Sequence, residues 1–328
     1  MDDQAYCCPA AECNRRRLVE IEGGLCCPPS CPIRTFYPFA QGTNVPVFTK
    51  ALDSANEYTR KDAAVYHDNA LRWLFATFKT EEAELRRRLV ARLELTRGSK
   101  VLVTGAGTCD DLPYLADKLD GQGEIFAQDI ALQMLLVGAQ RHQEALTRRG
   151  LEVHLSVSDA TKLPFADDYF DAAYHFGGIN LFSNVARGIS EMNRVVRPGG
   201  RIVIGDEGVA PWLKNTEIGR ILCTNNQLYN HDPPLELLPA YCNSVKLSWE
   251  LSNSFFVIEF TVSDQPLPVD LDVRHLGTRG GSLRTRYLGQ LEGVDPTLRD
   301  RIYLEAERLG ISRVEFIESL LRSGLPNS

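Results

Sequence analysis

Long apolar runs are missing from this chain. No stretch of its 328 residues approaches the roughly 18 consecutive apolar residues of a membrane-spanning helix, so we expect no membrane span. Residues 1–4 carry neither the basic cluster nor the apolar core of a secretory signal. We therefore expect a cytoplasmic protein.

An excess of positive charge is missing as well. The chain has 36 Lys and Arg against 43 Asp and Glu, and its net charge is −7. This balance argues against a broad nucleic-acid-binding surface, because phosphates attract basic patches. The hydrophobic content of 44% and the length suit one large globular domain with one or two smaller appendages.

Cysteine is rare after residue 31 and concentrated in the first 31 residues, which hold six of the nine cysteines. In a cytoplasmic chain, such clustering indicates a metal more than disulfides. Two pairs suit the four thiolate ligands of a structural zinc ribbon. These are Cys8 with Cys13, and Cys27 with Cys31. Both spacings are looser than the usual one, so Cys7 and Cys26 stay alternative ligands, and the other interpretation is a cysteine-rich tail without its metal.

Apolar strands alternate with helical patterns from residue 100 to about 206. This alternation is typical of a parallel sheet with crossover helices, that is, an α/β fold. The last strands, within residues 207–262, are expected to be partly antiparallel. We divide the chain into a ribbon at 1–48, a central domain at 49–262 and a tail at 263–328.

A glycine turn follows the first strand of the central domain. The strand Lys100 to Thr104 runs into Gly105-Ala106-Gly107, and glycine lets the backbone pass close to a ligand. Asp129 ends the second strand, about where a ribose-binding carboxylate would sit, and Asp159 follows the third. The alternative for each aspartate is a strand-end or helix-capping role.

Two further segments complete the pattern. Residues 160–171 read Ala-Thr-Lys-Leu-Pro-Phe-Ala-Asp-Asp-Tyr-Phe-Asp, and residues 191–204 contain Arg-Val-Val-Arg-Pro-Gly-Gly. Together with the glycine turn, they resemble the class I S-adenosylmethionine-dependent methyltransferases, in the ubiquinone/menaquinone methyltransferase branch (methyltransferase type 11). The resemblance covers roughly residues 60–262. It implies a Rossmann-like sheet with helices on both faces.

The resemblance also implies a cofactor, S-adenosylmethionine, and the transfer of its methyl group. The glycine turn would hold the methionine part, Asp129 the ribose, and Asp159 with Ala160 the adenine. The implied cofactor contacts are Gly105, Gly107, Thr108, Asp129, Ile130, Asp159, Ala160 and His175.

Two positions depart from the family pattern. Val103 stands where an acid usually precedes the first glycine by two residues, and Cys109 stands where a third glycine is usual. The missing acid normally helps to orient the amino group of the cofactor, and Asp110 and Asp111 offer substitute charge. These departures leave a non-catalytic, partner-binding descendant as an alternative function.

Residues for the acceptor are expected at the ends of the fourth and fifth strands. His175 is the candidate general base, because an imidazole pKa near 6.5 suits proton removal around neutrality. Asp206, beside Glu207, would bind the acceptor or act as the base. The alternatives are a structural histidine and a strand-end carboxylate pair.

The tail carries four arginines and no acid between residues 274 and 288. Guanidinium groups suit carboxylates and phosphates, so this loop favours an anionic small-molecule acceptor. The alternatives are RNA methylation, with the ribbon and this loop contacting RNA, and pairing of the arginines with the protein's own acids. Two capped helices are expected next, begun by Asp295 and by Ser312 with Glu315, and they offer a dimerisation element.

Overall fold

The computed structural model describes residues 5–49, 57–288 and 295–326. The chain forms two compact units, residues 1–265 and 266–328. The predicted ribbon and central domain therefore fall together in the first unit. Among the described residues, no helix is both long and apolar enough to cross a membrane.

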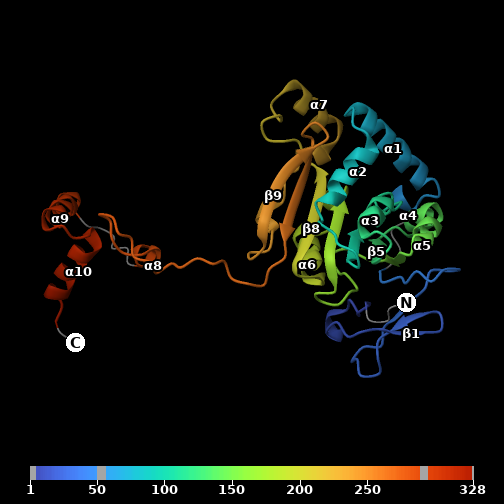
Figure 1. The fold of residues 1–328 in the computed structure, drawn as a ribbon, viewed down its shortest axis with the longest axis horizontal. Coiled ribbons are helices and arrows are strands. Elements are labelled where there is room, and N and C mark those ends of the chain that lie inside the picture. The colour runs from blue at the N-terminus through green and yellow to red at the C-terminus, as the bar shows by residue number, and fades with distance from the viewer. Residues whose placement is uncertain (1–4, 50–56, 289–294, 327–328) are drawn as a thin grey trace. The chain divides into compact units, whose positions relative to one another are not determined.

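A seven-stranded sheet forms the centre of the first unit, in the order β6-β5-β4-β7-β8-β10-β9 (Figure 1). The first five strands of this order are parallel, and β10 runs antiparallel to both of its neighbours, β8 and β9. Their bounds are β4 Lys100–Thr104, β5 Glu124–Asp129, β6 Glu152–Val157, β7 Phe170–Phe176, β8 Val196–Glu207, β9 Asn243–Glu250 and β10 Phe255–Thr261. The predicted α/β fold, including its partly antiparallel last strands, is confirmed.

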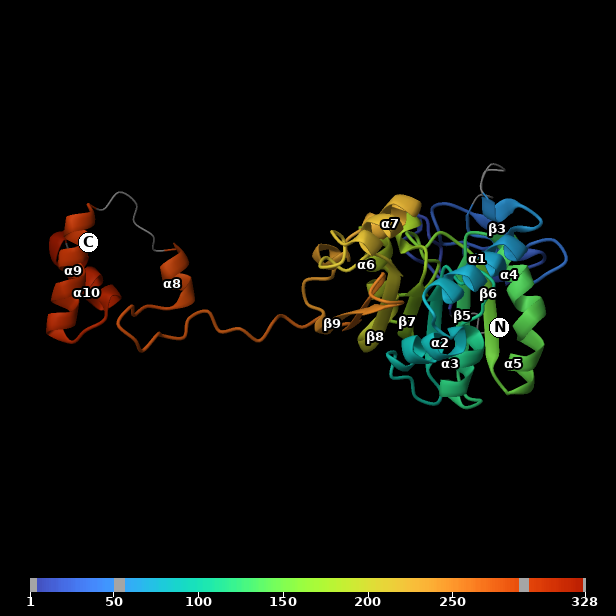
Figure 2. The same cartoon turned by 90° about the horizontal axis from the view of Figure 1, so that it is seen from above.

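Helices cover both faces of the sheet, as the resemblance implied (Figure 2). Successive strand residues point to opposite faces, so Val101 and Val103 of β4 pack beneath α2 and α3, whereas Leu102 packs with α6. The helices of this unit are α1 Ala63–Thr77, α2 Glu82–Ala91, α3 Leu112–Leu119, α4 Leu132–Gly138, α5 Glu144–Arg148, α6 Val185–Val195 and α7 Glu217–Asn225. A π-helical turn, Ala139–Gln143, joins α4 to α5.

The N-terminal segment packs onto the α6 side of the sheet. Its three short antiparallel strands are β1 Val19–Ile21, β2 Gly24–Cys26 and β3 Phe36–Pro38. The Tyr6 ring stacks on Phe165 with centroids 5.4 Å apart, and the Cys7 N–H donates to the Pro164 carbonyl at 2.9 Å. The ribbon thus shares a core with the sheet.

The second unit contains α8 Leu283–Leu288, α9 Pro296–Leu309 and α10 Arg313–Gly324. Both predicted caps are present: the Asp295 carboxylate accepts the Thr297 N–H at 2.8 Å, and Ser312 with Glu315 forms a capping box.

Two of the four tail arginines pair with acids of the same unit. Arg284 lies 2.9 Å from Asp272, and Arg274 lies 3.8 Å from Glu315. Arg286 instead donates to the Gly280 carbonyl. Pairing with the protein's own acids, one of the alternatives for this loop, is therefore found at two of its arginines.

Cys109 occupies the position of the third glycine without obstructing the turn. Its φ of +62° is left-handed, and its side chain is buried in the core beside Gly138 of α4. A methyl carbon on Gly138 would lie 2.6 Å from the Cys109 sulfur and 2.9 Å from the Thr108 carbonyl carbon. The absence of a side chain at Gly138 therefore makes room for the one at Cys109.

This packing predicts that Gly138→Ala lowers the free energy of unfolding by about 1–3 kcal/mol, because the added methyl overpacks the core. Cys109→Gly should recover part of that loss in the double variant. Denaturant unfolding measures both, with Gly324→Ala as the control, since an added methyl there meets nothing within 4 Å. Wild-type stability in Gly138→Ala would contradict this packing.

Candidate active site

Two adjoining cavities lie at the carboxyl ends of the parallel strands, where open α/β sheets bind ligands. The first cavity has a volume of about 520 Å³ and the second about 330 Å³. They share the glycine turn, Gly105 and Gly107, and the side chain of His67 from α1. A ligand in one cavity would therefore touch a ligand in the other near this turn.

The first cavity brings together seven of the eight predicted cofactor residues. Those that line it are Gly105, Gly107, Asp129, Ile130, Asp159, Ala160 and His175. Thr108, the eighth, lines the second cavity.

Asp129 ties the glycine turn to the end of β5. One carboxylate oxygen accepts the Gly107 N–H and the other accepts the Ala131 N–H, both at 2.8 Å. Burial raises the pKa of this carboxyl despite those bonds. Each oxygen accepts one of these bonds and has a second lone pair, so the side chain is shaped to receive hydroxyl donors as well.

Asp159 faces the first cavity and also holds the turn after β6. It lines the first cavity, and its Oδ1 accepts hydrogen bonds from the backbone N–H and the hydroxyl of Thr161, both at 2.8 Å. The turn that follows β6 is therefore fixed by the same carboxylate that faces the cavity.

His175 lies directly behind the glycine turn. Its Nδ1 lies 2.9 Å from the Thr104 carbonyl, which can only accept, so Nδ1 carries the proton and Nε2 is unprotonated. Nε2 is buried and has no hydrogen-bond partner among the described residues, and burial lowers the pKa of the imidazole. The Cε1 of His175 would lie 3.0 Å from a methyl carbon on Gly105, so glycine is needed there.

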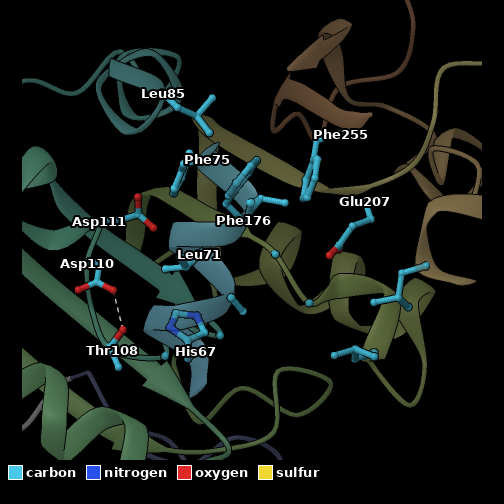
Figure 3. A pocket seen from close by; sticks show the side chains of 18 of the residues that line it. His67, Leu71, Phe75, Leu85, Thr108, Asp110, Asp111, Phe176, Glu207 and Phe255 are labelled. Carbon is cyan, nitrogen blue, oxygen red and sulfur yellow. Dashed lines mark hydrogen bonds between the residues drawn. The ribbon is translucent and has the colours of Figure 1, made fainter. Parts of the chain in front are cut away.

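The second cavity is mostly apolar (Figure 3). Helices α1 and α2 contribute Leu71, Phe75 and Leu85, and the sheet contributes Phe176 and Phe255. Residues almost 200 positions apart in sequence therefore form one apolar wall.

Glu207, rather than Asp206, faces the second cavity (Figure 3). Asp206 is fully buried, and its oxygens accept the backbone N–H groups of Asn180 at 2.7 Å and of Glu207 at 2.9 Å. Burial, and then the hydrogen bond and charge of Asp206, raise the pKa of Glu207 to about 9. Glu207 therefore holds a proton at neutral pH and can both donate and accept.

Sequence reasoning did not single out His67 or Arg86, which line the second cavity. Neither belongs to a strand-end motif; both come from helices that precede the sheet. Only the helical register of α1 and α2 could have indicated that they face inward.

A cluster of thiols lies in the N-terminal segment. The sulfurs of Cys8, Cys13 and Cys27 lie within 4.8 Å of one another, and those of Cys13 and Cys27 are 3.5 Å apart. Cys31 is within hydrogen-bonding reach of Cys13 and Cys27. Three of the four predicted ligands therefore form a close group, and Cys31 interacts with two of them.

Known proteins match the central part of this unit. Residues 102–204 match the methyltransferase domain family. The chain is 37% identical over 115 residues to a ubiquinone/menaquinone biosynthesis C-methyltransferase from Bordetella avium, covering 35% of this chain and 43% of that protein. The corresponding protein from Burkholderia mallei is 33% identical over 153 residues, covering 45% and 61%. The chain thus spans about half the length of these curated relatives.

A solved structure shows the same fold. Phosphoethanolamine N-methyltransferase 2 from Haemonchus contortus, in complex with S-adenosyl-L-methionine, aligns with a TM-score of 0.50 and 14% identity, covering 71% of this chain and 63% of that one. The strand order, the glycine turn and the sequence matches together identify a Rossmann-like domain. Residues 102–204 match a methyltransferase domain, and this part of the chain is similar to the ubiquinone/menaquinone C-methyltransferases.

The raised pKa of Glu207 predicts a pH-dependent stability. The folded state keeps a proton that the unfolded state releases above its ordinary pKa of 4.5, so stability falls as pH rises from there to about 9. The amide of Glu207→Gln resembles the neutral carboxyl but does not titrate. The melting temperature of this variant should therefore fall less between pH 4.5 and about 9 than that of the wild type. Glu144→Gln, on an exposed helix surface, is the control. Equal pH slopes in Glu207→Gln and wild type would contradict the buried, protonated carboxyl.

Proposed function

We propose that this chain transfers the methyl group of S-adenosylmethionine to a small-molecule acceptor. The observation that carries this proposal is the pair of cavities joined at the glycine turn. One of them holds the residues that suit the cofactor, and the other is an apolar chamber of small-molecule size.

The polar groups that line the first cavity match those of the cofactor. Asp129 can accept the ribose hydroxyls, and Asp159 with the Ala160 backbone suits the adenine. The glycine turn leaves room for the methionine part. When bound, the cofactor supplies an electrophilic methyl group on a good leaving group, so the protein mainly has to position the acceptor and exclude water.

The second cavity favours a largely apolar acceptor with one neutral polar group. Its walls are aliphatic and aromatic, and the protonated carboxyl of Glu207 offers a hydrogen bond. Asp110 and Asp111 also line it, against the single guanidinium of Arg86, so an anionic acceptor is disfavoured. We assign acceptor contact to Glu207, and to Asp206 the positioning of Glu207 and Asn180.

His175 stays the candidate base on the cofactor side. Its proton is held on Nδ1 by the Thr104 carbonyl, which presents the unprotonated Nε2. Its lowered pKa keeps the ring neutral at physiological pH. The neutral ring with an unprotonated Nε2 is the state that a proton acceptor needs, and the lowered pKa makes it a weaker base than a free imidazole.

The RNA alternative has less support. The chain is acidic overall, and two of the four tail arginines pair with acids of their own unit. Dimerisation through α9 and α10 stays a prediction.

We predict that Asp129→Ala weakens binding of S-adenosylhomocysteine at least about tenfold, because charge-assisted hydrogen bonds to the ribose are lost. Asp129→Asn, which keeps the side-chain shape, should also weaken it. Calorimetric titration measures the affinity, and a thermal melt checks that each variant folds. Asp117→Asn, an exposed carboxylate on α3, is the control. Unchanged affinity in both Asp129 variants would sink the ribose assignment.

We also propose that Cys8, Cys13, Cys27 and Cys31 hold a structural zinc ion. Four converging thiols are a donor set that zinc prefers, and these are buried in the small core of the ribbon. The ion would tie together the two ends of a segment that has only short strands.

Elemental analysis of the purified protein is expected to give about one zinc per chain. The double variant Cys27→Ser with Cys31→Ser should lose it and unfold at a lower temperature, because metal binding contributes folding energy. Cys223→Ser in α7, outside the cluster, should keep the metal. A zinc content unchanged by the double variant, or no zinc in wild type, refutes the site.

A further inference from the structure

The second unit has helices but very few buried side chains. Among its described residues, 266–288 and 295–326, only Gly280, Ser282 and Ala306 are buried. A unit of this size usually needs disulfides, a metal or a partner when its own core is too small. Residues 266–328 contain no cysteine, so disulfides cannot supply the missing stability.

Helices α9 and α10 are too short to be stable without packing. They lie side by side within the unit (Figure 1 and Figure 2) and have 14 and 12 residues. Isolated helices of this length are marginal in water, and in proteins most of the stability of a helix comes from packing of its apolar side. The caps at Asp295 and Ser312 satisfy backbone N–H groups without covering apolar surface. Both helices therefore need something that covers their apolar sides.

Those apolar sides are half exposed. On α9, Leu298, Ile302 and Leu309 recur at helical spacing. On α10, Leu320 and Leu321 are adjacent. The four leucines among these residues are each between 46% and 48% exposed, and we term them the tail leucines. In a unit without a large buried side chain among its described residues, they indicate an incomplete core.

Charge favours a second copy of the tail as the cover. Residues 266–328 carry nine arginines, no lysine and nine acidic residues, so the unit has no net charge. The net charge of −7 therefore belongs to residues 1–265. Each helix is balanced as well, since α9 has three residues of each sign and α10 has two. Two such tails do not repel each other, and opposite charges can meet around an apolar contact.

We propose that the tails of two chains pair, with the tail leucines of one copy packed against those of the other, so that the protein is a dimer. In a two-fold interface both copies present the same surface, which must therefore be complementary to itself. An apolar, electrically balanced surface meets this condition. Folding of α9 and α10 is then coupled to association, because each copy covers the apolar sides of the other. The inference is independent of the proposed methyl transfer, whose residues all lie in the first unit.

The first unit of the same chain and an unrelated protein are the competing covers. Contact with the first unit would leave the chain monomeric, and the helical content of the tail would not depend on protein concentration. An unrelated protein would also leave the purified chain monomeric. The mass of the purified chain in solution therefore separates the proposed pairing from both.

Sedimentation equilibrium of the full chain should give twice the mass of one chain. The double variant Leu320→Glu with Leu321→Glu places two carboxylates in each of the paired tails, and like charges that meet at an interface are strongly unfavourable. Its dimer dissociation constant should rise at least about a hundredfold above that of the wild type.

Leu276→Glu with Leu304→Glu is the matched control. It makes the same chemical change at two leucines of the same unit, which are 100% and 66% exposed. Leu304 lies on the other side of α9 from Leu298 and Leu309, so this variant should remain dimeric. All three tryptophans of the chain lie in residues 1–265, so a melt followed by tryptophan fluorescence checks that the first unit of each variant is folded.

Circular dichroism adds a second readout. Dilution of the wild type should lower its helical signal in step with dissociation, because α9 and α10 lose their cover. A wild type that is monomeric at micromolar concentrations, or a dimer that persists in the Leu320 and Leu321 double variant, would overturn the inference. Equal loss of the dimer in both double variants would overturn it too, because the effect would then not belong to the tail leucines. Dissociation without loss of helix would contradict the coupling of folding to pairing.

Discussion

The two hydrogen bonds that Asp129 accepts from the backbone hold the site together. They join the glycine turn after β4 to the start of α4 after β5, so two strand ends keep a fixed separation. The position of the glycine turn also determines where Asp110 lies. Gly105 and Gly107 of this turn form the wall that both cavities share. A carboxylate that satisfies these N–H groups can still accept hydrogen bonds from ligand hydroxyls, and the proposed ribose contact rests on this capacity.

The sequence predicted the first cavity well because of a topological constraint. Parallel strands end at one edge of a sheet, so residues that follow β4, β5, β6 and β7 must lie near one another. Seven residues chosen from strand ends line one cavity for this reason. The second cavity could not be predicted in the same way. Its walls come from α1, α2 and β10, whose packing depends on tertiary contacts between segments far apart in the chain.

Single positions show where sequence patterns stop being informative. From the sequence, Asp206 and Glu207 are equally plausible as site residues. Successive side chains of β8 point to opposite faces of the sheet, so Asp206 is buried in the protein and Glu207 faces the second cavity. Cys109 stands where the family pattern has a third glycine, and its side chain enters the core beside Gly138. Val103 replaces the usual acid with an apolar side chain, which is 3% exposed and packs in the core.

The central claim is that the first cavity is the site of S-adenosylmethionine, with its methyl group directed toward the second cavity. A crystal structure with S-adenosylhomocysteine tests it most directly. The account predicts the adenine beside Ile130 and Asp159, the ribose hydroxyls on Asp129 and the sulfur at the glycine turn. Ligand density elsewhere, or a ribose turned away from Asp129, would contradict it.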